Sequence, residues 1–356
     1  MRIVVRARRH AASIGMLVAS AASPRTGFAQ EWRADETRHG TLTVATDDHP
    51  GGGVHDPSAR RAAAALADSL LSVLRRDPAL SSPIGYTVSL HRVAGSNSGD
   101  ARADGARFYA GVSGAFWGFL LKDGAPEPEA SGKTPFDAYV NNLWACPYSE
   151  DYAIEARGKS MIDGGLPILA GIRRTGELRG HPIYNGQCIV LTNRREPPFL
   201  PVSRERYLKL ELLGMRAKLD AFRRQIDYDK LDPNMRAAYD NSLEESNRII
   251  TARAAELERM SAADRAAPAA VRQNGVDDST LVAPDEDGAA PLVTINPAFF
   301  DRSLPGGVAQ VITVNLPFVQ AGVTPQRTPD EPARRAHAEK IRDGLDWAAL
   351  ERMLRP

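Results

Sequence analysis

The sequence predicts an α+β protein, with an antiparallel sheet and a packed helix, an inserted antiparallel helical hairpin and a C-terminal helix. Three observations point to this class. A helical apolar stripe precedes a series of short apolar runs separated by turn residues. Two consecutive helical stripes follow residue 200, and strand-forming residues return near the C-terminus. The predicted parts are a leader at 1–29, an α+β body at 30–200, the hairpin at 203–261, a flexible linker at 262–290, and strands with a helix at 291–356 that complete the body.

Residues 1–29 have the three-part layout of a secretory signal peptide. Four arginines and no acid fall in the first ten residues, 11–22 are small and apolar, and the segment ends in Gly27-Phe28-Ala29. An apolar run of about twelve residues is shorter than the roughly twenty that cross a bilayer. We therefore expect cleavage near Ala29 and a periplasmic or secreted chain without a transmembrane segment. The pair Arg8-Arg9 leaves both the general secretory route and the twin-arginine route open.

Cleavage also changes the net charge of the chain. The full sequence has 45 Lys+Arg and 44 Asp+Glu, a net charge of +1, and 1–29 contain five Arg and no acid, so the mature chain has a net charge of −4. A mildly acidic chain lacks the basic surface that phosphate backbones and anionic lipids attract. We therefore expect no nucleic-acid partner.

The two cysteines, Cys146 and Cys188, are the one pair that could form a disulfide. An oxidising compartment favours pairing. The alternative is two buried free thiols. Two cysteines are too few for a thiolate metal site, so cysteine chemistry predicts a structural crosslink and no cofactor.

The body is predicted from its apolar periodicity. A helix begins at Pro57 and runs to Arg76, because Ala62, Leu66, Leu70, Leu71 and Leu74 recur at helical spacing. A strand follows from Ile84, where apolar and polar residues alternate. The run 108–121 indicates one or two strands with aromatic faces, and 136–144 an ordered segment. Further apolar runs at 166–172, 182–184 and 188–192 are separated by turn residues and are typical of an antiparallel meander.

The hairpin is predicted from a heptad-like seam. After the possible N-cap Ser203, apolar residues step by four, three, four, three and four: Leu208, Leu212, Met215, Leu219, Phe222 and Ile226. A break at Asp232-Pro233-Asn234 precedes a second stripe of Tyr239, Leu243, Ile250, Leu257 and Met260, which Ser246 and Arg253 weaken. Each helix alone would expose its stripe, so we expect the two to fold back on each other. The stripes then pack within the chain, or part of the seam around 208–222 contacts another protein.

The rest of the chain is predicted from composition. Residues 262–290 are rich in Ala, Asp, Pro and Gly without apolar periodicity, which favours a flexible linker. The runs 292–295 and 308–316 favour strands that complete the N-terminal sheet, since two strands alone are unstable. A closing helix from Pro332 to Met353 has Ile341, Leu345, Leu350 and Met353 on one side.

The candidate catalytic and ligand-binding motifs lack the residues or the spacing that their chemistry requires. The cluster His49 and His55 with Asp47, Asp48 and Asp56 has metal-ligand chemistry, but flexible residues separate the two histidines, and a solvated loop is the better interpretation. The glycines 51–53 before a helix lack the strand and spacing of a dinucleotide site. Gly132-Lys133-Thr134 lacks the first glycine of a phosphate loop, because Glu127 stands there. In Gly95-Ser96-Asn97-Ser98-Gly99 an asparagine takes the place of the nucleophile, and Ser113 lies in a strand without an elbow.

The sequence thus predicts an exported, non-catalytic binding or envelope-assembly protein whose hairpin at 203–261 is its interaction element. The alternative is an exported hydrolase whose residues come together only in the fold. A cleft that holds His91, His181 or His55 beside a carboxylate would favour that alternative.

Overall fold

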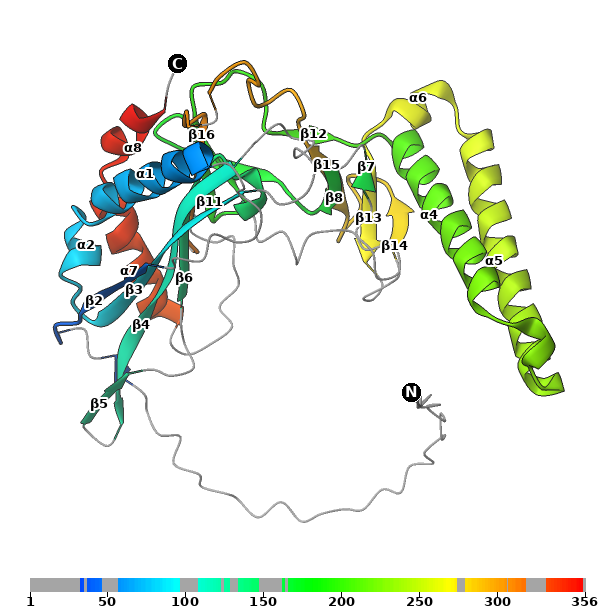
Figure 1. Cartoon of the computed structure of the whole chain (residues 1–356), viewed down its shortest axis with the longest axis horizontal. Helices are drawn as coiled ribbons and strands as arrows, with labels where there is room; N and C mark the ends of the chain where they lie inside the picture. The colour runs from blue at the N-terminus through cyan, green and yellow to red at the C-terminus, as the bar shows by residue number, and fades with distance from the viewer. Residues whose placement is uncertain are drawn as a thin grey trace, which may run out of the picture.

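A computed structural model of the 356-residue chain describes residues 33–34, 37–46, 57–96, 108–122, 125–128, 134–146, 162–163, 166–273, 279–305, 307–317 and 331–354. Within them the chain forms two sheets, helices on one face of the larger sheet, and a helical hairpin that projects from the smaller one (Figure 1). Most strand pairs are antiparallel. This confirms the α+β class.

The larger sheet has the strand order β2-β3-β4-β6-β16-β11-β10-β9. The bounds are β2 Leu42–Thr46, β3 Tyr86–Ser96, β4 Phe108–Lys122, β6 Thr134–Val140, β16 Val311–Asn315, β11 Cys188–Thr192, β10 His181–Tyr184 and β9 Arg174–Leu178. The short strands β1 (Arg33–Ala34) and β5 (Ala125–Pro128) pair with the end of β4. Strand β16 lies between β6 and β11, so a late strand completes the N-terminal sheet as the sequence predicts.

The smaller sheet has the order β14-β13-β15-β8-β7, with β12 also paired to β15. The bounds are β14 Ser279–Val282, β13 Ala270–Gln273, β15 Ala290–Ile295, β8 Leu166–Ala170, β7 Ile162–Asp163 and β12 Phe199–Pro201. The late run 292–295 therefore belongs to a separate sheet, which corrects the prediction that both late runs extend one sheet. Its partner β8 lies over a hundred residues earlier in the chain, and nothing local in the sequence specifies that pairing.

The body helices cover one face of the larger sheet (Figure 1). They are α1 Pro57–Leu74, α2 Pro78–Ser81, α7 Glu331–Gly344 and α8 Trp347–Met353, with a 3-10 turn η1 at Leu143–Ala145 after β6. The closing helix is thus two helices. The break falls at Leu345 and Asp346, because Leu345 is buried and Asp346 caps α8 by accepting from the Ala349 amide at 2.9 Å.

The hairpin consists of α4 Arg204–Gln225 and α5 Pro233–Arg259, joined by a 3-10 turn η2 at Tyr228–Lys230. It lies between β12 and β13 of the smaller sheet. Ser203 caps α4 by accepting from the Arg206 amide at 3.3 Å, and Asp232 caps α5 by accepting from the Met235 amide at 2.8 Å. The Ser203 cap confirms the sequence prediction, whereas Asp232, predicted only as part of a break, also caps the second helix.

The segment predicted to be a linker, 262–290, differs from that expectation. Its described residues form a short helix α6 (Ala262–Ala266), the strands β13 and β14, and the start of β15. Ala269, Ala270 and Val271 are buried beneath the hairpin base and beside β15. The strands β13 and β14 have only four residues each, which is too short for a periodicity that the sequence could reveal.

The three larger buried cores of the described residues lie between successive layers of the structure. The largest lies between the helices and the larger sheet, and the second joins the β11 and β16 end of that sheet to the smaller sheet. The third lies between the other face of the smaller sheet and the base of α4, where Tyr207 and Leu208 are fully buried. The hairpin is therefore anchored at its base.

Candidate functional site

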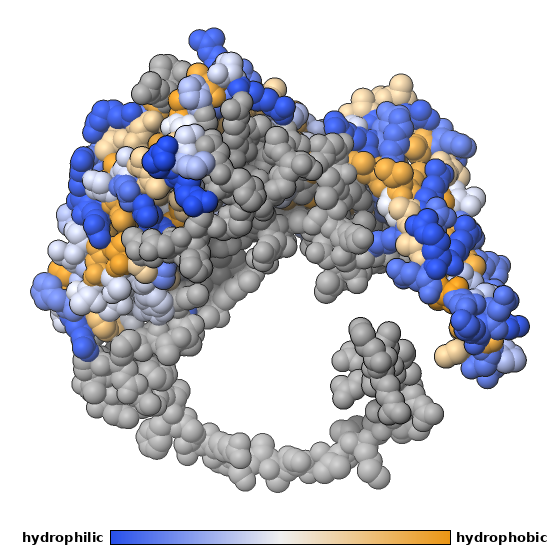
Figure 2. All heavy atoms as spheres, viewed as in Figure 1, coloured by the Kyte–Doolittle hydropathy of each residue, from blue (hydrophilic) through white to orange (hydrophobic). Residues whose placement is uncertain are grey.

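The hairpin is the first candidate, because its second helix, α5, is far less buried than the helices of the body. The 22-residue α4 buries Tyr207, Leu208, Glu211, Leu212 and Leu219, which lie mainly in its first half. The 27-residue α5 has no buried side chain. Figure 2 shows apolar residues exposed between polar ones along the hairpin. Long helices of soluble proteins normally bury a stripe, so the far part of this hairpin has apolar surface that the described chain leaves partly open.

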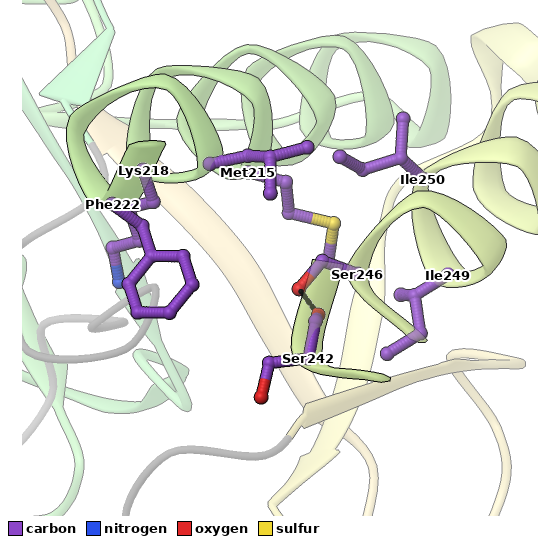
Figure 3. A pocket seen from close by; sticks show the side chains of 8 residues that line it. Met215, Lys218, Phe222, Ser242, Ser246, Ile249 and Ile250 are labelled. Atoms are coloured by element: carbon purple, nitrogen blue, oxygen red, sulfur yellow. Dashed lines mark hydrogen bonds between the residues drawn. The ribbon is translucent and has the colours of Figure 1, made fainter. Parts of the chain in front are cut away.

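A pocket of about 270 Å³ lies between α4 and α5. Side chains of Met215 and Phe222 on α4 face those of Ser246 and Ile249 on α5 across it (Figure 3). The full lining is Met215, Lys218, Leu219, Phe222, Ser242, Ser246, Ile249 and Ile250. Its walls are mainly apolar, and such a lining favours an apolar side chain as occupant.

The serines of this pocket are held by their own helix. The Ser242 hydroxyl donates to the Ala238 carbonyl at 2.8 Å, and the Ser246 hydroxyl donates to the Ser242 carbonyl at 2.7 Å. Both hydroxyls thus donate to backbone carbonyls of α5, and among the described residues neither is hydrogen-bonded to a base that could activate it as a nucleophile. The sequence predicts Ser246 as a weak point of the seam and does not single out Ser242 and Ile249. The i, i+4, i+7 spacing of 242, 246 and 249 is the signal that could have found this face.

Polar and aromatic contacts fix the two ends of the pocket. Towards the base, Arg253 Nε lies 3.4 Å from Glu211 Oε2, and Arg253 Nη1 lies 2.8 Å from Glu256 Oε2. Towards the tip, the rings of Phe222 and Tyr239 stack with centroids 5.0 Å apart. The hydroxyl of Tyr228 donates to Asp240 Oδ2 at 2.9 Å, and this hydrogen bond raises the pKa of Tyr228. The Glu211–Arg253 ion pair and the Phe222–Tyr239 stack join α4 to α5, so they hold the two helices side by side.

A second candidate is a polar row on the face of the larger sheet that points away from the body helices. Strand register pairs His91 of β3 with Ser113 of β4, and Ser113 with Asp137 of β6. Directly paired residues of neighbouring strands lie on one face, with Cβ atoms about 5 Å apart. A serine, a histidine and an aspartate therefore share one face, in an alignment that depends on strand register and that the sequence alone does not show.

The contacts in this row are not those of a catalytic triad. His91 is exposed, and its Nε2 lies 3.4 Å from the Ser89 hydroxyl. A side-chain hydrogen bond joins Ser113 to Tyr139, whose pKa is raised by burial and by the charge of Asp137. In a triad the histidine lies between the serine and the carboxylate, whereas here the serine lies between the other two.

The other sequence candidates are scattered. His181 on β10 lies 3.3 Å from Glu351 of α8, at the opposite edge of the larger sheet. Thr134 is buried in β6, and Gly95 and Ser96 end β3. The leader 1–29, the cluster of His49 and His55 with Asp47, Asp48 and Asp56, the glycines 51–53, Asn97 to Gly99 and Gly132-Lys133 lie outside the described residues. Within the part of the chain that is described, no group of three His, Cys, Asp or Glu side chains is arranged to hold a metal.

The structure joins Cys146 and Cys188 in a disulfide, with Cα atoms 5.6 Å apart. Cys146 follows η1 and Cys188 begins β11, and both are fully buried in the core between the two sheets. This geometry confirms the predicted pairing of the two cysteines. The bond ties the 3-10 turn after β6 to the larger sheet, so its role is structural.

Two titratable groups are buried under the body helices. Asp77 caps α2 by accepting from the Ala79 amide at 2.8 Å, and burial raises its pKa to about 6. His337 on α7 packs against the Tyr86 ring at 4.4 Å, and burial, followed by the charge of Lys340, lowers its pKa to about 4. Neither nitrogen of His337 has a hydrogen-bond partner among the described residues. The histidine is thus held neutral in the core.

No family is identified for this chain by comparison with known proteins. Comparisons with protein-family models, characterised proteins and solved structures find no significant match to this chain. Across the residues described here, no helix combines the length and the apolar composition needed to cross a membrane.

Proposed function

We propose that this chain is an exported, non-catalytic protein that binds another protein through the far part of its helical hairpin, as a binding or envelope-assembly factor. The observation that carries the proposal is the contrast within the hairpin: α5 has 27 residues and no buried side chain, yet it borders a mainly apolar pocket. A protein segment with apolar anchors at i and i+3 or i+4 spacing is the natural occupant of a groove between two helices.

Export is supported by two independent features. The leader pattern of 1–29 directs secretion, and the disulfide between Cys146 and Cys188 is typical of an oxidising compartment. Cell fractionation with N-terminal sequencing tests this part. We expect a periplasmic or secreted product that begins at Gln30, and a cytosolic product that retains Met1 would contradict export.

Site-specific photo-crosslinking tests the binding role in the producing cell. A benzophenone side chain at Met215, which lines the pocket, should crosslink to a protein partner. The same group at Glu244, an exposed residue on the other side of α5, is the matched control and should give little product. Equal crosslinking at both positions, or none at Met215, would contradict binding through this face.

The alternative of an exported hydrolase is favoured by one observation, the alignment of His91, Ser113 and Asp137 across three strands. A fluorophosphonate probe tests it, because such a probe labels a serine only when a base activates the hydroxyl. Labelling that Ser113→Ala abolishes and Ser89→Ala leaves intact would establish the hydrolase. No labelling of Ser113 is the result that the binding proposal expects.

A further inference from the structure

The pocket between α4 and α5 is long enough for more than one side chain of a partner. Its lining runs from Met215 to Phe222 on α4 and from Ser242 to Ile250 on α5, which corresponds to about 10 Å and about 12 Å at the rise of an α-helix. Apolar residues at i and i+4 of another helix are about 6 Å apart along its axis, and those at i and i+7 about 10 Å. The length of the pocket therefore fits the apolar side chains of a single helix.

Gly214 leaves room for the backbone of such a helix. It lies inside α4, four residues before Lys218, and therefore on the same face one turn nearer the hairpin base. A Cβ atom placed on Gly214 would meet nothing within 4 Å, so packing within the described chain gives no reason for a glycine there. A glycine is costly inside a helix, and one of its uses is to let another backbone approach closely.

Lys218 gives the pocket a positive edge. It is the one charged residue among those that line the pocket, and it is half-buried at the Phe222 end (Figure 3). A lysine in such a place packs its stem on apolar neighbours and keeps its ammonium group towards water. On α5, the carboxylate of Glu245 lies next to Ser246 and forms an ion pair with Arg248 at 2.7 Å, which balances its charge. A carboxylate is therefore the group of a partner that complements this edge.

We infer that the hairpin binds an acidic amphipathic helix of another protein. The bound helix lies along the pocket with its apolar side chains inside it, and its backbone passes close to Gly214. An aspartate or glutamate one turn from an apolar anchor pairs with the ammonium group of Lys218. This inference rests on the proposed function, because it names the chemistry of the partner that the same face binds.

A displayed library of helical peptides tests the inference on the purified mature chain, 30–356. Each peptide has leucines at i, i+4 and i+7, and the flanking positions are drawn equally from Glu, Lys and Gln. We expect the bound peptides to be enriched about fivefold in Glu over Lys at a flanking position, which is the effect of a favourable exposed ion pair. Lys218→Glu should reverse this preference to Lys. Arg216→Glu makes the same charge change on the opposite, exposed side of α4 and should retain the preference for Glu.

Two substitutions of Gly214 test where the helix lies, with one selected Glu-containing peptide as the probe. Gly214→Ala favours the helix without filling the space, and it should change the Kd by less than about threefold. Gly214→Leu also favours the helix, but its side chain takes the space of the bound backbone and should raise the Kd about tenfold or more. Far-UV circular dichroism checks the fold of every variant, and Lys218→Gln, which should abolish the charge preference, replaces Lys218→Glu if that variant loses helix.

Three results would overturn the inference. They are the absence of Glu enrichment, a charge preference that the folded Lys218 variant leaves unchanged, and equal affinity of the Gly214→Ala and Gly214→Leu variants for the probe.

The crosslinker at Met215 separates failure of this inference from failure of the proposed function. A crosslinked segment of a partner in which Asp or Glu lies three or four residues from an apolar anchor, without proline between them, supports the inference. A crosslinked segment that lacks this pattern overturns the acidic helix and leaves binding through the hairpin standing. The absence of any crosslink overturns both.

Discussion

Helices α1 and α5 show how two amphipathic helices of one chain reach different degrees of burial. The 18-residue α1 buries six side chains against the larger sheet, among them Leu70 and Leu74, which are fully buried. The 27-residue α5 is half as long again and buries none. Both have apolar residues at helical spacing, so the difference lies in what each helix packs against. A sheet can cover the whole apolar stripe of a helix, whereas a single neighbouring helix covers only part of that stripe.

The difference teaches that the two regions are stabilised in different ways. The body depends on non-local packing, in which α1, α2 and the C-terminal helices meet six strands of the larger sheet in one core. The hairpin depends on local contacts: caps at Ser203 and Asp232, the Phe222–Tyr239 stack and ion pairs such as Arg248–Glu245. Local contacts of this kind are each worth a fraction of a kcal/mol to about 1 kcal/mol. A hairpin with so little burial keeps apolar surface available for a partner.

The largest expected effect comes from removing one leucine side chain in each region. Leu70→Ala leaves a cavity in the body core and should lower the free energy of unfolding by about 3–5 kcal/mol. Leu243→Ala on the half-exposed α5 should lower it by about 1 kcal/mol, since water fills the space. All four tryptophans lie outside 203–261, so denaturation followed by tryptophan fluorescence reports on the body and far-UV circular dichroism reports on both regions. Equal losses in the two variants would contradict the contrast.

Removing the disulfide should have the next largest effect, and only on the body. The bond spans a sequence separation of 42 residues, for which chain entropy gives about 4 kcal/mol, with a usual range of 2–4 kcal/mol. Cys146→Ala with Cys188→Ala should lower the tryptophan-detected midpoint in denaturant by the corresponding amount. A change of under about 1 kcal/mol would show that the crosslink adds little to this core.

Two buried groups should give the body opposite pH dependences of about 2 kcal/mol each. His337 has a folded pKa of about 4 and an unfolded value of 6.5, so its contribution to stability is present above pH 6.5 and is lost as pH falls towards 4. Asp77 has a folded pKa of about 6 and an unfolded value of 3.8, so its contribution is present below pH 3.8 and is lost as pH rises through 6. Between pH 4 and pH 6, a rise in pH therefore increases the contribution of His337 to stability and decreases that of Asp77.

Single variants separate the pH dependence due to His337 from that due to Asp77. Relative to wild type, His337→Phe should gain about 2 kcal/mol of stability when the pH is lowered from 7 to 4.5, and Asp77→Asn should lose about 2 kcal/mol over the same range. Asparagine keeps the acceptor that caps α2, so the comparison isolates the charge. Glu245→Gln on the exposed hairpin is the control and should show no such trend. Parallel pH profiles for all three variants and wild type would contradict buried titration in the body.

The predictability of the fold follows the same division between local and non-local structure. The bounds of α1, the caps of α4 and α5 and the hairpin itself follow from spacing and cap residues within a few turns of each helix. The smaller sheet does not, because β8 and β15 meet across more than a hundred residues of chain. The strands inside 262–290 also escape prediction, because Ala269 and Val271 are buried in the core under the base of α4, and Ala270 is buried with Val282 and Ala289.

The candidate sites divide in the same manner. The seam residues Leu208 to Phe222 can be read from the sequence, but the absence of any buried residue on α5 cannot, since it depends on what the folded body leaves uncovered. The row of His91, Ser113 and Asp137 requires the register of three strands, and local sequence does not set the register between strands that are separated by longer segments such as 97–107. Local periodicity predicts which faces are apolar, and only the assembled fold decides which of them stay open.

The smallest expected effect is the sharpest test of the comparison. Glu211 and Arg253 lie 3.4 Å apart across the hairpin, so the chain can be shortened just beyond them by replacing 214–250 with a short Gly-Ser linker. This keeps Tyr207, Leu208 and Leu257 in the core under the hairpin base. The tryptophan-detected free energy of unfolding should change by less than about 1 kcal/mol, because the removed residues contribute nothing to the body cores. Circular dichroism should lose the helical signal of the removed turns. A body that loses cooperative unfolding would mean that the far part of the hairpin stabilises the fold, and the open face would then need no partner to explain it.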